Sequence, residues 1–77
     1  MKKKVKKAIE GMVDEPVMVF YKPIAPTPEN NNAQWVADIL KEVSSTGIKL
    51  REHYWIEWSW IQTFSGGNKR FTKKDFQ

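Results

Sequence analysis

Three of the four tryptophans in this 77-residue chain lie close together, in an aromatic segment that runs from His53 to Phe64. Aromatic and β-branched residues favour a pleated surface, so the segment is predicted to be a strand, whose side chains point alternately to its two faces. The face expected to join the core carries Tyr54, Ile56, Trp58, Trp60 and Phe64. A helix remains open as an alternative. The residues that would line up on it are Leu50, Tyr54, Trp58 and Ile61.

The second face of this predicted strand holds the candidate partner-binding residues, which are His53, Trp55, Glu57 and Ile61. Tryptophan often anchors protein interfaces, so Trp55 is the expected anchor. For Trp55 and Ile61, burial under an N-terminal helix fits the pattern equally well. A His–Glu pair can do acid–base work or help to hold a metal, but ordinary solvent-facing polar residues are the simpler interpretation of His53 and Glu57.

Length and composition limit the chemistry of the chain. Residues 1–77 have room for a single small domain, and the absence of cysteine removes disulfides, thiolate metal sites and cysteine nucleophiles. With one histidine and scattered carboxylates, we expect no catalytic residues, no metal site and no cofactor. The lysines near the start are not followed by an apolar leader segment, and no run reaches the ~18 apolar residues of a membrane span. The sequence therefore predicts a soluble cytoplasmic protein that is not an enzyme.

Charge is unevenly distributed. The formal net charge is +4, with five lysines and no acid in residues 1–7, a net +3 in residues 69–77 and a net −4 in residues 8–68. The chain is thus an acidic body with two basic ends. The lysine-rich start has three interpretations: a solvated helix face, an arm that binds the nucleic-acid backbone, or a helix on a membrane surface.

Two helices are predicted from apolar spacing. A short one over residues 2–13 would place Val5, Ala8, Ile9 and Met12 on one face. The main one, over about 32–45, would begin at a cap on Thr27 or Asn32 and end near Gly47. Its apolar face would be Val36, Ile39, Leu40 and Val43.

The remaining segments read as strands and loops. Residues 17–21 are a continuous apolar run typical of a buried strand, and the prolines within residues 22–28 predict a stiff loop. Residues 65–68 contain paired glycines and predict a hairpin turn into a charged edge strand, 69–72. We expect the tail 73–77 to be loosely held unless Phe76 docks on the core.

Together these elements predict an α+β fold of order α-β-α-β-β. A small antiparallel or mixed three-stranded sheet would carry the main helix, about 32–45, on one face, with a short N-terminal helix beside it. The basic ends, 1–4 and 73–77, would be loosely ordered.

The favoured function is a small non-enzymatic protein-binding module of the adaptor or inhibitor type, with a homodimer through a strand edge as one variant. The alternative is a single-stranded nucleic-acid-binding protein that stacks bases on Trp55. Its candidate phosphate contacts are Lys49, Arg51, Lys69 and Arg70. Glu52 and Glu57 in the same segment oppose a phosphate path. In style, a tiny, lysine-led, tryptophan-rich chain is similar to small proteins of phages and mobile elements.

Overall fold

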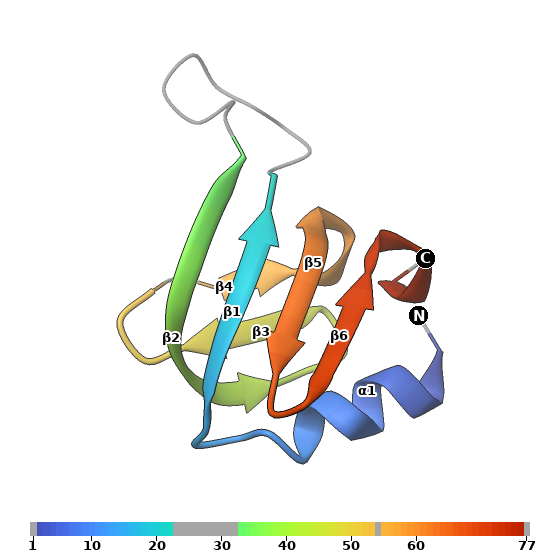
Figure 1. Cartoon of the computed structure of the whole chain (residues 1–77), viewed down its shortest axis with the longest axis horizontal. Helices are drawn as coiled ribbons and strands as arrows, with labels where there is room; N and C mark the ends of the chain where they lie inside the picture. The colour runs from blue at the N-terminus through green and yellow to red at the C-terminus, as the bar shows by residue number, and fades with distance from the viewer. Residues whose placement is uncertain (1, 23–32, 54, 77) are drawn as a thin grey trace.

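The computed structural model describes residues 2–22, 33–53 and 55–76, which form one short helix, six strands and two 3-10 turns. In chain order they are α1 (Lys3–Glu10), β1 (Pro16–Tyr21), β2 (Gln34–Val43), β3 (Gly47–Leu50), β4 (Trp55–Glu57), the turn η1 (Trp58–Trp60), β5 (Ile61–Gly66), β6 (Lys69–Thr72) and the turn η2 (Lys73–Phe76). Every paired strand is antiparallel to its neighbour, in the order β4-β3-β2-β1-β5-β6 (Figure 1).

The long strand β2 joins two layers of the sheet. Its first part pairs with β1, and its last part pairs with β3 after a register shift between Leu40 and Glu42. Figure 1 shows β3 and β4 passing behind β1 and β5 and running across them, while α1 covers the lower end. The sheet is therefore folded over on itself at β2, as in orthogonally packed sheets whose corner is a bent strand.

The core lies between these two layers and α1. Val5, Ile9 and Met12 of the N-terminal segment close its lower end. The other buried side chains are Val17, Val19, Val36, Leu40, Ile48, Leu50, Ile56, Trp58, Ile61, Phe64 and Phe76. The short N-terminal helix and the 65–68 turn are confirmed, since residues 3–10 are helical and Gly67 takes a φ of 56° between β5 and β6. Positive φ is a conformation that glycine adopts without strain.

The main helix predicted over about 32–45 is wrong, and with it the α-β-α-β-β order and the three-stranded sheet. This stretch is the strand β2, paired on one side with β1 and on the other with β3. Val36 and Leu40 are four residues apart, a spacing that suits one face of a helix and, being even, one face of a strand. Pairing along both edges selects the strand. The predicted caps at Thr27 and Asn32, and the prolines of the predicted loop, lie outside the described residues.

The single strand predicted from His53 to Phe64 is also wrong. It is divided into β4 and β5 by the 3-10 turn η1, in which Trp58 donates from Nε1 to the carbonyl oxygen of Ser44 at 3.0 Å. The turn shifts the alternation of faces, so Ile61 points into the core and is fully buried. Tyr54 lies outside the described residues.

The C-terminal segment packs against the body. Phe76 is buried with its ring stacked on Trp58 at a centroid distance of 5.9 Å, and the backbone N–H of Thr72 donates to Asp75 Oδ2 at 2.9 Å. Residues 73–76 therefore form an ordered turn that keeps Lys73 and Lys74 close to the folded body. Among the helices of the described segments, none has the length and apolar character to cross a membrane.

Candidate functional site

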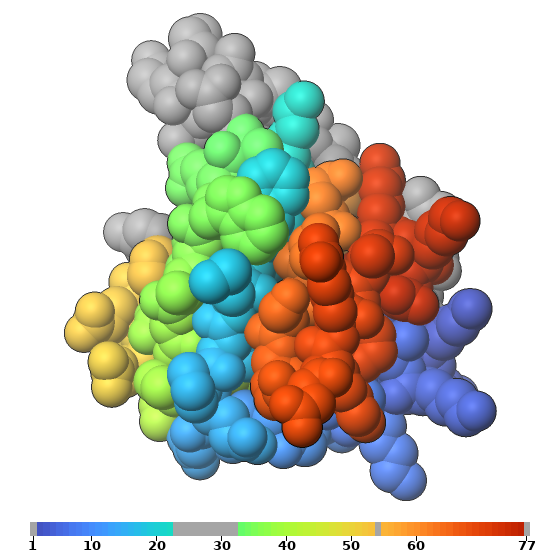
Figure 2. Space-filling model, in the orientation of Figure 1, coloured from blue at the N-terminus to red at the C-terminus, as the bar shows by residue number. Residues whose placement is uncertain are grey.

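The most distinctive surface is the side of β2, β1, β5 and β6 that points away from the core; we call it the open face. Along β1, Val17 and Val19 are buried, so the alternate residues Met18 and Phe20 project outward. Strand register assigns the rest. The residues of the open face are Met18, Phe20, Trp35, Ala37, Thr63, Ser65, Arg70 and Thr72. This face is turned toward the viewer in Figure 2, where the side chains of β1, β2 and β5 lie next to one another.

An aromatic pair forms the centre of the open face. Phe20 and Trp35 are direct partners across the β1–β2 ladder, and their ring centroids lie 4.6 Å apart with a tilt of 30°. Trp35 remains 57% exposed, the largest exposure among the big hydrophobic residues of the described chain, and Met18 is 47% exposed. A shallow hollow of about 490 Å³ beside Met18 continues down the face. The pair therefore offers an exposed apolar surface, mainly that of Trp35, to a ligand.

The part of the open face on β5 and β6 is polar, and its side chains include no carboxylate. Thr63 and Ser65 of β5 pair with Thr72 and Arg70 of β6, so hydroxyls and one guanidinium extend from the aromatic pair to the sheet edge. Two acids border the face: Glu15 lines the hollow, and Asp75 accepts the backbone N–H of Thr72 at 2.9 Å. Among the side chains assigned to this face, an anionic ligand would meet hydroxyl and guanidinium donors and no carboxylate.

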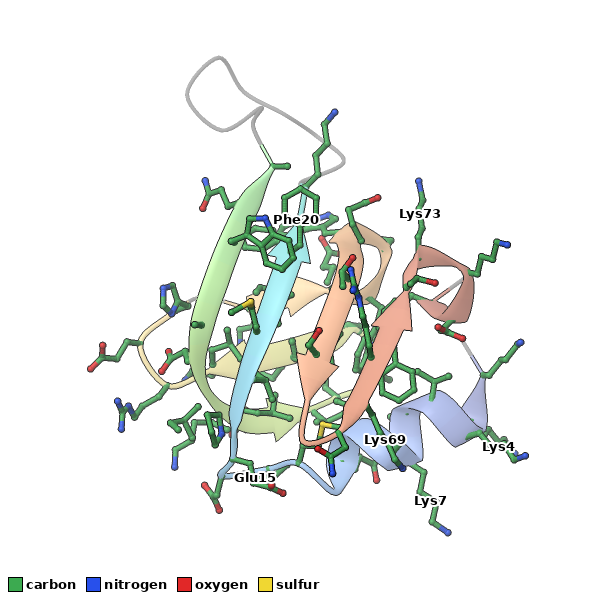
Figure 3. The ribbon with its side chains drawn as sticks, in the orientation of Figure 1. Lys4, Lys7, Glu15, Phe20, Lys69 and Lys73 are labelled. Carbon is green, nitrogen blue, oxygen red and sulfur yellow. The ribbon has the colours of Figure 1, made fainter. Side chains whose placement is uncertain are left out.

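The fold also brings together the two basic ends of the sequence. In Figure 3, Lys4 and Lys7 on α1 project on the side of the molecule where Lys69 begins β6 and Lys73 begins η2. We call this side the basic edge. It adjoins the open face through β6, because Arg70 points outward from the same strand that Lys69 begins.

The residues predicted around Trp55 lie on the opposite layer. Trp55 is 44% exposed on β4, where it pairs with Lys49, and Glu57 pairs with Gly47. We call the outer side of this hairpin, with Lys49, Trp55 and Glu57, the back face. It holds one aromatic between opposite charges. Ile61, the fourth candidate, is in the core and offers no surface to a partner.

The carboxylate of Asp38 contacts two further residues that the sequence predicted as binding candidates, His53 and Arg51. Its Oδ2 lies 2.9 Å from Nδ1 of His53, and its Oδ1 lies 3.9 Å from Nε of Arg51. The backbone N–H of Glu52 donates to Oδ2 at 2.7 Å, and this bond, followed by the one with His53, lowers the pKa of Asp38 from 3.8 to about 2. Arg51 and His53 thus surround a carboxylate that orders the turn before β4.

Of the predicted phosphate contacts, Lys69 and Arg70 lie beside the open face, whereas Lys49 and Arg51 lie elsewhere. The sequence does not predict the aromatic pair, because Trp35 falls within the helix predicted over about 32–45 and Phe20 falls within the buried strand predicted over 17–21. The signal was present in residues 17–21: five consecutive apolar residues make both faces of a strand apolar, and only one of them can face a single core.

No group of three metal-ligating side chains occurs within residues 2–22, 33–53 and 55–76. Comparison with protein families, with curated proteins and with solved structures finds no significant match for this chain. The open face and the basic edge are therefore the features of the described chain that bear on its function.

Proposed function

We propose that this protein binds single-stranded nucleic acid without catalysing a reaction, with bases stacked on the Trp35–Phe20 pair. One observation carries the proposal: an aromatic pair with an exposed tryptophan lies on a sheet face whose side chains include no carboxylate and which runs into a basic edge. Every base has a π-face, so stacking on aromatic side chains beside a cationic path holds single strands with little sequence preference.

The change of platform from Trp55 to Trp35 removes the main objection to this function. Glu57 projects from the back face beside Trp55, and Glu52 lies in the turn before β4. Neither belongs to the open face. A phosphate path from Trp35 across β5 meets Thr63, Ser65 and then Arg70. A cytoplasmic location, where single-stranded nucleic acid is made and processed, suits this ligand.

A protein partner is the second candidate for the same surface. Met18 and Ala37 extend the aromatic pair into a continuous apolar strip, and a central tryptophan in such a strip is typical of interface anchors. An adaptor or inhibitor would use it in this way. A second copy of the chain is one such partner, since β4 and β6 both end the sheet.

The chain offers a matched pair of variants to test the proposal. Trp35→Ala and Trp55→Ala each remove one exposed tryptophan from a strand, on opposite layers. Binding of a fluorescently labelled oligothymidylate, followed by anisotropy at low salt, should weaken about 10- to 100-fold in Trp35→Ala, since stacking contributes about 1–3 kcal/mol per base. Trp55→Ala should bind as the parent protein does. Circular dichroism of both variants checks that the fold is retained.

The two candidate functions give different results. Equal affinities for Trp35→Ala and the parent protein would contradict the stacking proposal. Complete lack of oligonucleotide binding at low salt would reject nucleic acid as the ligand and favour a protein on the open face. If sedimentation shows a dimer that Trp35→Ala dissociates, the partner is a second copy of the chain.

A further inference from the structure

We infer that the bound nucleic-acid strand does not end at β6. It continues into a groove between α1 and β6, where lysines from both ends of the protein chain hold its phosphates. This inference rests on the proposed function and extends its binding site. It assigns a role to the N-terminal lysines, which the open face alone does not use.

The groove is a feature of the described structure. Two hollows, of about 450 and 540 Å³, lie along the line where α1 meets the β5–β6 hairpin, and Ala8 and Lys69 border both of them. Figure 2 shows α1, in blue, next to β6, in red, along this line. Gly66 makes the close approach possible, because a Cβ there would lie 2.6 Å from Sδ of Met12.

Four lysines and two acids are the charged residues that line this α1–β6 groove. Lys2, Lys4 and Lys7 come from the N-terminal segment, and Lys69 comes from β6. The acids along it are Glu15 at one end and Asp75 at the other, and Asp75 already accepts the backbone N–H of Thr72 at 2.9 Å. Residues more than 60 positions apart in sequence thus line one groove with a net positive charge.

The geometry of β6 connects the α1–β6 groove to the open face. Arg70 and Lys69 are consecutive on β6, so their side chains point to opposite sides of the sheet. Arg70 faces the same side as Ser65 on the open face, whereas Lys69 borders the groove. A phosphate backbone that passes Arg70 at the sheet edge therefore meets Lys69 next and then the lysines of α1.

Charge complementarity favours a polyanion with regularly repeated charges as the occupant. Each lysine that neutralises a phosphate of a single strand contributes about −0.7 to the slope of log affinity against log salt. Arg70, Lys69 and the three α1-side lysines together predict a slope of about −3.5 for a long strand. A short strand that covers only the aromatic pair should have a much smaller slope.

Helix α1 contains a second pair of lysines that serves as a matched control for the lysines of the groove. Lys4 and Lys7 line the groove, whereas Lys3 and Lys6 do not, and both pairs have the same spacing on the same helix. The variants Lys4→Ala/Lys7→Ala and Lys3→Ala/Lys6→Ala therefore remove equal charge. Alanine is the stronger helix former, so neither variant should lose α1.

The test uses oligothymidylates of about 4 and about 12 nucleotides, both within the usual range of single-strand footprints, in salt titrations. We expect Lys4→Ala/Lys7→Ala to bind the longer strand about 10-fold more weakly at ~0.1 M salt, with the slope reduced by about 1.4. It should bind the short strand like the parent protein. Lys3→Ala/Lys6→Ala should change the slope by less than half as much.

Equal losses in the two double variants would overturn the groove, because the lysines would then act only through the general positive field. If the slopes of log affinity against log salt are unchanged while binding remains sensitive to Trp35→Ala, the inference about the groove is wrong and the proposed function stands. If no oligonucleotide binds the parent protein, both proposals fail. Binding of anionic phosphatidylserine vesicles alone, lost in Lys4→Ala/Lys7→Ala, would assign the groove to a membrane surface.

Discussion

The open face and the back face each present one tryptophan with about half of its surface exposed, yet their surroundings differ. Trp35 packs on Phe20 beside threonines, a serine and Arg70, whereas Trp55 stands on β4 between Lys49 and Glu57. The exposure of an aromatic ring alone does not distinguish them. The charges and rings around each tryptophan do, and they favour an anionic, stackable ligand on the open face alone.

The difference follows from the position of the strands. β1 lies near the centre of the sheet, paired with β2 and β5, so residues on its outer side are surrounded by neighbours that can form a broad surface. β4 is a three-residue strand at the sheet edge, and its outer side has neighbours only on β3. A broad contact surface is therefore available on the open face and not on the back face.

The largest effect is expected where the aromatic segment enters the core. Ile61→Ala removes a fully buried side chain and should lower the free energy of unfolding by about 2–5 kcal/mol. Urea denaturation followed by circular dichroism measures the loss. A cost below about 1 kcal/mol would indicate that Ile61 is a surface residue, like its neighbour Trp55 in the segment.

A smaller effect is expected from giving the open face the kind of charge that the back face has. Ser65→Glu places a carboxylate near Arg70 and the proposed phosphate path. Repulsion of about 1 kcal/mol at contact in water corresponds to an approximately fivefold loss of oligonucleotide affinity. The control, Glu57→Gln, removes a carboxylate from the back face and should leave the affinity measured by anisotropy unchanged. A larger effect from Glu57→Gln would reverse the assignment of the two faces.

The two tryptophans should also differ slightly in their contribution to stability. Trp35→Ala loses the packing on Phe20 and should cost about 1 kcal/mol, within the range for aromatic pairs. Trp55→Ala, at an exposed edge, should stay within about 0.5 kcal/mol of the parent protein. Thermal melts of both variants give the comparison. A larger cost for Trp55→Ala would mean that the back face is covered.

The last prediction concerns the pH dependence of stability and Asp38, which orders the turn leading to the back face. Its pKa is lower in the folded protein than the ordinary value of 3.8, so its carboxylate stabilises the fold above about pH 4. That contribution is lost as the pH falls through about 2, the pKa in the folded state. Melting temperatures should therefore fall less steeply between pH 4 and 2 in Asp38→Asn than in the parent protein. Parallel pH profiles would contradict this role.

Local patterns in the sequence were sufficient for α1, for the strand at residues 17–21 and for the hairpin at 65–68. They failed at β2, where the spacing of Val36 and Leu40 fits a helix and a strand alike, and only pairing with β1 and β3 decides. They failed again at η1, since Trp58-Ser59-Trp60 contains neither glycine nor proline to mark the break. Candidate residues on these two segments were consequently assigned to the wrong surroundings.

One nuclear magnetic resonance titration tests the central claim most directly. Each of the four tryptophans gives an indole N–H signal, so a single nitrogen–proton spectrum reports on both faces at once. On addition of an oligothymidylate, the Trp35 signal should shift strongly, while the Trp55 signal and the buried Trp58 signal stay in place. A shift of Trp55 with Trp35 unchanged would contradict the assignment of the open face as the nucleic-acid interface.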